Sequence, residues 1–161
     1  MHTHILNQLK QNKTVVPVKQ VSLRQLQEQT EHYPINILLA EDNNTNQDVE
    51  IKILNKLGYY PDVAQNGLEV LKMTEAKNYD LILMDVQMPQ MDGREATKII
   101  RKRKCPQPVI AAVTANAIHG DEELCLAAGM DEYLAKPVSL KKIAELIEKC
   151  VSIVKDSQLS S

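Results

Sequence analysis

The 161-residue chain is 43% hydrophobic and 25% charged, which suits one globular domain and argues against a disordered or fibrous protein. Its net charge of −2 favours neither nucleic acid nor an anionic membrane as a partner, and no apolar run reaches the roughly 20 residues of a membrane span. Three widely spaced cysteines without a CxxC pair indicate a reducing compartment, so we expect a cytoplasmic protein or the cytoplasmic part of a membrane-tethered polypeptide.

Residues 1–34 differ in character from the rest of the chain. They lack glycine and the regular apolar spacing that follows, and they are rich in Gln, Lys, Thr and Val. Ser22 and Gln25 have the spacing of a capping box, which would begin a short helix. We interpret residues 1–34 as a linker or N-terminal arm, residues 35–155 as the folded domain and residues 156–161 as a tail.

From residue 35 the chain alternates between short apolar runs, typical of buried parallel strands, and amphipathic stretches, typical of helices. Strands are predicted over residues 35–40, 61–64, 80–84, 108–113 and 132–135. Helices are predicted over residues 44–57, 68–77, 94–103, 117–127 and 139–154. The first helix carries four apolar side chains at helical spacing, namely Val49, Ile53, Leu54 and Leu57. The third should end in a solvated basic run, residues 101–104.

Five strand–helix repeats predict an α/β fold with a doubly wound, five-stranded parallel sheet covered by helices on both faces. The common strand order at this size is 2-1-3-4-5, with its switch point between strands 1 and 3. Ligands of such sheets lie at the carboxyl ends of the strands beside that point, so the residues that follow the strands are the candidates for chemistry.

Polar side chains follow four of the predicted strands. They are Glu41 and Asp42 after strand 1, Asp85 after strand 3, Thr114 after strand 4 and Lys136 after strand 5. Each alone would be an ordinary cap or loop residue, but this set at these strand ends is not explained by capping. Three converging carboxylates stay ionised only if cations join them, and Mg²⁺ is the divalent ion that suits such oxygen ligands.

Lys136 adds a second positive charge beside Asp85. A carboxylate between a metal ion and an ammonium group is suited to attack on phosphorus, because the cations neutralise the phosphoryl oxygens. Thr114 can donate its hydroxyl to one of those oxygens. The sequence therefore predicts that Asp85 accepts a phosphoryl group.

The chain resembles the receiver (response-regulator) family over nearly all of residues 35–154, and most of all the receivers of hybrid sensor histidine kinases. The segments that carry the resemblance are LLAEDNNTNQ at 38–47, LILMDVQMPQMDG at 81–93, AAVTANA at 111–117 and DEYLAKPVSL at 131–140. The resemblance implies the receiver, flavodoxin-like fold.

The resemblance also implies residue roles. Asp85 would be the phosphoacceptor, and Lys136 would bind the phosphate, with a cis peptide bond before Pro137. Metal ligands would come from Glu41, Asp42 (the direct ligand), Asp85 and the backbone carbonyl of Gln87. Thr114 and Tyr133 would form the switch pair, in which the hydroxyl follows the phosphoryl group and the ring turns inward. Gln87 and Asn116 resemble positions that tune water attack and phosphate lifetime.

On this interpretation the chain is a phosphorelay receiver that needs Mg²⁺, with Mn²⁺ as a substitute. It takes the phosphoryl group from the phosphohistidine of a histidine kinase or a histidine phosphotransfer protein and hydrolyses the acyl phosphate slowly. It is a self-modifying switch and not a turnover enzyme. We expect neither a nucleic-acid partner nor direct insertion into a membrane.

Three other functions share parts of this pattern. A flavin-binding protein of the same fold would need hydroxyl- and glycine-rich phosphate loops and stacking aromatic residues, whereas the loops here are acidic and Phe and Trp are absent. A haloacid-dehalogenase-type phosphatase would need a second acid two residues after the nucleophile, where this chain has Gln87. A non-phosphorylated interaction module is the third alternative.

Overall fold

The computed structural model describes residues 33–160, with side chains described as far as residue 158. The predicted arm and its capping box at Ser22 and Gln25 lie outside these residues, except for the last two residues of the arm. Across the described range, none of the helices is both long enough and apolar enough to cross a membrane.

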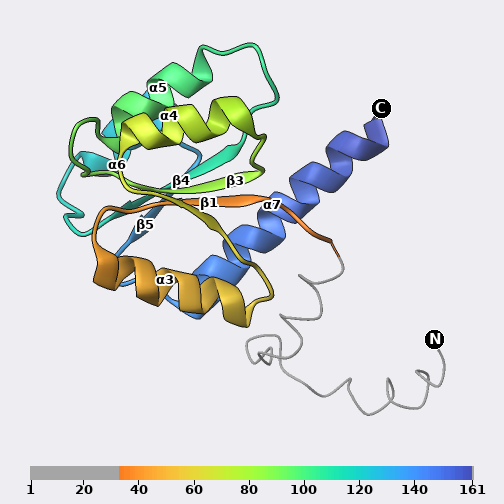
Figure 1. Cartoon of the computed structure of the whole chain (residues 1–161), viewed down its shortest axis with the longest axis horizontal. Coiled ribbons are helices and arrows are strands. Elements are labelled where there is room, and N and C mark those ends of the chain that lie inside the picture. The colour runs from red at the N-terminus through yellow and green to blue at the C-terminus, as the bar shows by residue number, and fades with distance from the viewer. Residues whose placement is uncertain (1–32, 161) are drawn as a thin grey trace.

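The domain is a parallel sheet between two helical layers, as predicted. Its five strands lie in the order β2-β1-β3-β4-β5: β1 (Ile37–Ala40), β2 (Asp62–Ala64), β3 (Leu81–Asp85), β4 (Val109–Thr114) and β5 (Glu132–Ala135). The helices between and after them are α3 (Asn44–Lys56), α4 (Gly67–Ala76), α5 (Gly93–Arg101), α6 (Asp121–Ala128) and α7 (Leu140–Ser160). Figure 1 shows α4, α5 and α6 on one face of the sheet and α3 and α7 on the other.

Both faces of the sheet are buried, which explains why its central strands are almost entirely apolar. Leu39 and Leu83 point into the core under α3 and α7. Leu38 and Ile82, one residue away along each strand, point into the core under α4, α5 and α6. All four side chains have no exposed surface, so β1 and β3 form a rigid platform for the residues that follow them.

Two helices differ from the prediction by more than two residues at one end. α6 begins at Asp121, four residues later than expected, because Gly120 adopts a left-handed φ of 87° and forms the N-cap. α7 continues to Ser160, six residues past its predicted end, so residues of the predicted tail are helical. There the Tyr33 hydroxyl donates to Oε1 of Gln158 at 2.5 Å, and Lys155 Nζ lies 5.2 Å from the Tyr33 ring centre.

Val49 belongs to the apolar spacing of α3 but does not face the core, since 47% of it is exposed. The inward position on this turn of α3 belongs to Glu50, which is buried together with Leu54 and Leu57. Positions 50, 54 and 57 are spaced i, i+4 and i+7, which places them on one helical face. The buried stripe of α3 therefore carries a carboxyl group.

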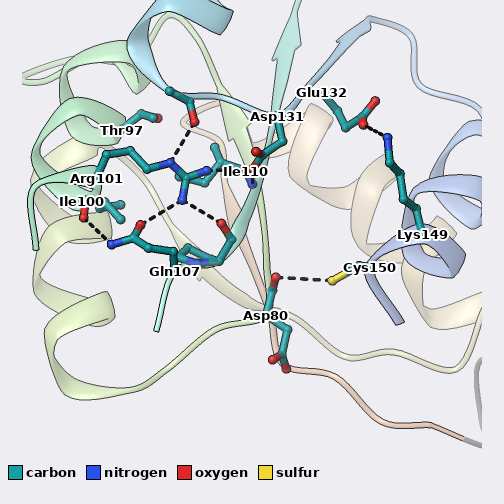
Figure 2. Close-up of polar contacts among 12 residues, drawn as sticks. Asp80, Thr97, Ile100, Arg101, Gln107, Ile110, Asp131, Glu132, Lys149 and Cys150 are labelled. Carbon is teal, nitrogen blue, oxygen red and sulfur yellow. Dashed lines mark hydrogen bonds and ion pairs between the residues drawn. The ribbon is translucent and has the colours of Figure 1, made fainter. Parts of the chain in front are cut away.

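The basic run at 101–104 is only partly solvated, and the prediction is wrong for its arginines. Arg101 Nε donates to the Gly129 carbonyl at 2.8 Å, and Nη2 pairs with Asp131 Oδ2 at 2.7 Å. Its Nη1 donates to Gln107 Oε1 and to the Pro108 carbonyl, both at 2.9 Å (Figure 2). Arg101 thus joins the end of α5 to the chain segments that lead into β4 and β5.

Tyr33 is hydrogen-bonded to the domain, and truncation should show what this contact contributes. The carbonyl of Tyr33 accepts a hydrogen bond of 3.0 Å from the hydroxyl of buried Tyr59. Deletion of residues 1–32 is expected to leave the melting temperature nearly unchanged, because the segment lacks the periodicity of the core. Deletion of residues 1–34 should lower the free energy of unfolding by about 1 kcal/mol, because the Tyr59 hydroxyl loses its acceptor. Urea unfolding of both truncations checks this, and a loss above about 2 kcal/mol for the shorter deletion would contradict it.

Candidate functional site

Three carboxyl groups meet at the carboxyl edge of the sheet. β1 and β3 are neighbours with Ala40 opposite Met84, so Glu41 and Asp85 emerge side by side. One carboxylate oxygen from each of Glu41, Asp42 and Asp85 lies within 4.8 Å of the others. Glu41 and Asp85 are buried, while Asp42 is exposed at the mouth of the site. The structure thus brings together the three acids that the sequence predicted as metal ligands.

Lys136 joins this cluster from the end of β5. Its Nζ lies 2.7 Å from Glu41 Oε1 and 3.3 Å from Asp85 Oδ2. Its backbone N–H donates to the Thr114 carbonyl at 2.8 Å, which fixes the start of its side chain beside β4. The following Lys136–Pro137 peptide bond is cis, as the resemblance implied. Lys136 is therefore the cation that balances two of the three acids.

The electrostatics of the two buried acids differ. Burial raises the pKa of Asp85, the nearby charge of Glu41 adds to this, and Lys136 only partly opposes it, so the pKa is about 6. Burial opposes ionisation of Glu41 too, but hydrogen bonds from Lys136 and the Asn43 N–H outweigh it and hold its pKa below the usual 4.5. A cation bound beside Asp85 would relieve the repulsion that keeps its pKa high.

The predicted lifetime residues lie beside Asp85, and the predicted switch residues lie on the neighbouring strands β4 and β5. Thr114 is buried at the end of β4, and its Oγ1 accepts from the Asn116 N–H at 3.0 Å. The Gln87 N–H donates to Asp85 Oδ1 at 3.3 Å, and Asn116 Nδ2 donates to Gln87 Oε1 at 3.2 Å. The Tyr133 hydroxyl is engaged by another residue, Asp121, to whose Oδ2 it donates at 2.6 Å. The role of the Gln87 carbonyl as a metal ligand stays a prediction.

Glu50 is a fourth carboxyl group near the site that sequence reasoning missed. It is 4% exposed, and burial followed by the charge of Glu41 raises its pKa to about 7. The signal was available, because Glu50 shares a helical stripe with Leu54 and Leu57. Asp121 was missed as well, and no local pattern connects it with Tyr133, which lies twelve residues further along the chain.

Glu50 should make the metal-free protein less stable as the pH rises. Its folded pKa of about 7 exceeds its ordinary value of 4.5, so between these values the folded state binds more protons than the unfolded state. The free energy of unfolding should fall across this window by up to about 3 kcal/mol. Glu50→Gln is expected to flatten the fall, measured by urea unfolding from pH 4.5 to 8 in EDTA. Glu145→Gln, on the exposed face of α7, is the control. Equal slopes in the two variants would contradict the assignment.

Comparison with known proteins places the chain among signalling proteins. The family model described as "Response regulator receiver domain" matches residues 37–148. The hybrid signal transduction histidine kinase K of Dictyostelium discoideum is 40% identical over 125 residues, which cover 73% of this chain and 10% of that protein. A probable histidine kinase 1 of Oryza sativa subsp. indica is 37% identical over 145 residues, 70% of this chain and 15% of that protein. The chain thus spans a small part of these relatives.

Two solved structures of receiver domains are similar to this chain in sequence and fold. The receiver domain of the sensor histidine kinase PA1611 from Pseudomonas aeruginosa, with a magnesium ion coordinated in its active site cleft, is 39% identical. The match has a TM-score of 0.69 and covers 73% of this chain and 98% of that one. The receiver domain of Ssk1 from Saccharomyces cerevisiae, in a co-crystal structure with the histidine phosphotransfer signalling protein Ypd1, gives 32% identity and a TM-score of 0.68. That match covers 75% of this chain and 91% of the other.

Proposed function

The chain belongs to the response regulator receiver domain family, and from this premise we propose that it accepts a phosphoryl group on Asp85 within a two-component phosphorelay. The observation that carries the proposal is the meeting of Glu41, Asp42 and Asp85 with Lys136 at one edge of the sheet. A nucleophilic carboxylate, a place for a divalent cation and a fixed ammonium group are the parts that phosphoryl transfer to a carboxylate requires.

The residues present fit a Mg²⁺ ion. Three carboxylate oxygens within 4.8 Å of one another are hard ligands, and one acid at the open mouth leaves room for water and phosphate oxygens. We propose Glu41, Asp42, Asp85 and the Gln87 carbonyl as the residues that hold it, with Mn²⁺ as a substitute. When bound, the ion supplies positive charge against the phosphoryl oxygens.

In the proposed reaction an oxygen of the Asp85 carboxylate attacks the phosphorus of a phosphohistidine. A P–O bond forms, the P–N bond breaks, and the bond's electron pair leaves with the histidine nitrogen. Lys136 lies close enough to Asp85 to stabilise the charge on the transferred group, and Thr114 can donate its hydroxyl to it. The hydrogen-bonded pair Gln87–Asn116 stands where it can affect the later attack of water on the acyl phosphate.

The product is a modified form of the protein itself, so the proposed role is a switch and not a turnover enzyme. We propose a histidine kinase or a histidine phosphotransfer protein as the donor, in the cytoplasm, because the relatives are hybrid histidine kinases and one structural neighbour is bound to a phosphotransfer protein. The proposed division of the chain is an arm over 1–34, the receiver over 35–155 and a tail over 156–161, into which α7 continues.

The proposal is tested by a gain of mass. The protein incubated with Mg²⁺ and acetyl phosphate should gain one phosphoryl group that is stable in acid and labile in base, and EDTA should prevent the gain. Intact-mass spectrometry measures it, and circular dichroism confirms that the protein is folded. A folded protein that gains no mass would be the non-phosphorylated interaction module and would overturn the proposal.

A further inference from the structure

The hydroxyl of the predicted switch tyrosine has a specific partner. Tyr133 OH donates to Asp121 Oδ2 at 2.6 Å, and Asp121 is 9% exposed although it carries a carboxylate. Hydrogen bonds to an ionised acceptor are roughly twice as strong as neutral ones. The tyrosine hydroxyl is therefore tied to the first residue of α6 by a charge-assisted hydrogen bond.

Thr114 and Asp121 lie at the two ends of the loop 115–120, and the Tyr133 hydroxyl contacts the second of these residues. β4 and β5 pair with Ala112 opposite Tyr133, so the tyrosine begins two positions before Thr114 on the neighbouring strand. Its ring packs among the apolar side chains under α4, α5 and α6 while its hydroxyl reaches the first residue of α6. A rotation of the ring that carries the hydroxyl away from Asp121 breaks this hydrogen bond, because such bonds weaken steeply with distance and angle.

The first turn of α6 is held in a way that makes its position depend on the hydrogen bond between Tyr133 and Asp121. Gly120, with a φ of 87°, forms the N-cap and offers no side-chain hydrogen bond to the helix. Asp121 is tied back into the loop by its N–H, which donates to the Ile118 carbonyl at 3.1 Å. The Ile118 N–H in turn donates to the Asn116 carbonyl at 2.9 Å, and the Asn116 N–H donates to Thr114 Oγ1. A continuous set of hydrogen bonds thus runs from Thr114 to Asp121.

We propose that Asp121 is the acceptor that holds Tyr133 outward in the unphosphorylated protein, and that release of this bond passes the switch to the first turn of α6. The proposal rests on the proposed function, because phosphorylation of Asp85 supplies the competing attraction on Thr114. A hydrogen bond to a charged group is strong enough to shift a two-state population about tenfold or more.

The affected surface surrounds the first turn of α6. A hollow of about 460 Å³ is bordered there by Ile118, His119, Glu122 and Tyr133. Ile118 is 69% exposed, so any movement of this turn changes an apolar part of the surface. The signal would reach this surface through Asp121 and not only through the ring of Tyr133.

The test removes each partner of the bond in turn. Asp121→Ala and Tyr133→Phe should each move the NMR signals of residues 116–124 of the unmodified protein toward the positions they reach with Mg²⁺ and beryllofluoride, a phosphoryl mimic. Each should also bind beryllofluoride about tenfold more tightly, since the competing state has lost its bond. The double variant should show little further change, because both substitutions remove one interaction. Glu123→Ala, in the same turn and exposed, is the matched control.

Two outcomes would overturn the inference. One is a beryllofluoride affinity of Asp121→Ala equal to that of Glu123→Ala, and the other is additive changes in the double variant. Tyr133→Phe keeps the ring and its packing, so it remains informative if Asp121→Ala folds poorly. Phosphorylation by acetyl phosphate is measured on the same samples. If the wild-type protein gains no phosphoryl group, the proposed function fails. If all variants are phosphorylated but the affinities do not change, only the role of Asp121 fails.

Discussion

Asp85→Asn is expected to abolish phosphorylation by acetyl phosphate in the presence of Mg²⁺. The substitution keeps the shape of a side chain that is 6% exposed, and it replaces the nucleophilic carboxylate by an amide. Intact-mass spectrometry measures the phosphorylated fraction over time. Asp48→Asn, which changes an exposed acid on α3, is the matched control and should be phosphorylated at the wild-type rate.

The same variant should be more stable than the wild type in EDTA. Burial and the charge of Glu41 both disfavour the ionised form of Asp85, so removal of its charge should raise the free energy of unfolding near pH 7 by about 1–2 kcal/mol. Mg²⁺ should reverse the order, because it stabilises the wild type and binds the variant weakly. Labelling of Asp85→Asn at the wild-type rate would show that another residue is the phosphoacceptor. A loss of stability in EDTA would show that Asp85 is a structural cap.

Lys136→Met should lower the free energy of unfolding more than any other substitution proposed for this site. Glu41 is 1% exposed, and its ion pair with Lys136 has an N–O distance of 2.7 Å. Removal of one partner leaves a buried charge without compensation, which typically costs about 3–5 kcal/mol. Because Lys136 holds the pKa of Glu41 down, that pKa should rise in the variant, and the loss of stability should grow as the pH increases from 4 to 8.

Lys136→Met should also slow phosphorylation by about a hundredfold or more, because an electrostatic stabiliser of the transferred group is lost. Urea unfolding in EDTA and in Mg²⁺ separates the two effects, since Mg²⁺ should restore part of the stability by supplying charge near Glu41. Lys141→Met, on the exposed side of α7, is the control. Equal unfolding curves for the two lysine variants would mean that the ion pair contributes nothing.

The sheet and the central site could be predicted because the sequence patterns that specify them are local or periodic. Buried parallel strands are recognisable as short apolar runs, and β5 was predicted with its observed bounds, Glu132–Ala135. The predicted strand order alone implied that Glu41, Asp42 and Asp85 lie close together, since residues that follow neighbouring parallel strands share an edge of the sheet.

Two of the missed features depend on contacts between residues that are distant in the sequence, and the start of α6 was missed for a local reason. The basic run at 101–104 looked like a solvated helix end, and only the tertiary structure shows that Arg101 is surrounded by carbonyl groups and Asp131. The start predicted for α6 at residue 117 was wrong, because the Asn116 N–H bonds to Thr114 Oγ1 in a loop and the left-handed Gly120 forms the N-cap. The partnership of Tyr133 and Asp121 likewise follows from the packing of β5 against α6.

The contact between Tyr33 and Gln158 brings the two ends of the described domain together. The chain enters the domain beside the place where α7 leaves it, and both lie toward the amino ends of the strands (Figure 1). The acidic site lies at the opposite, carboxyl edge. Both ends of the described domain thus lie away from the edge that bears Asp85 (Figure 1), so attachment of further chain at either end leaves that edge uncovered.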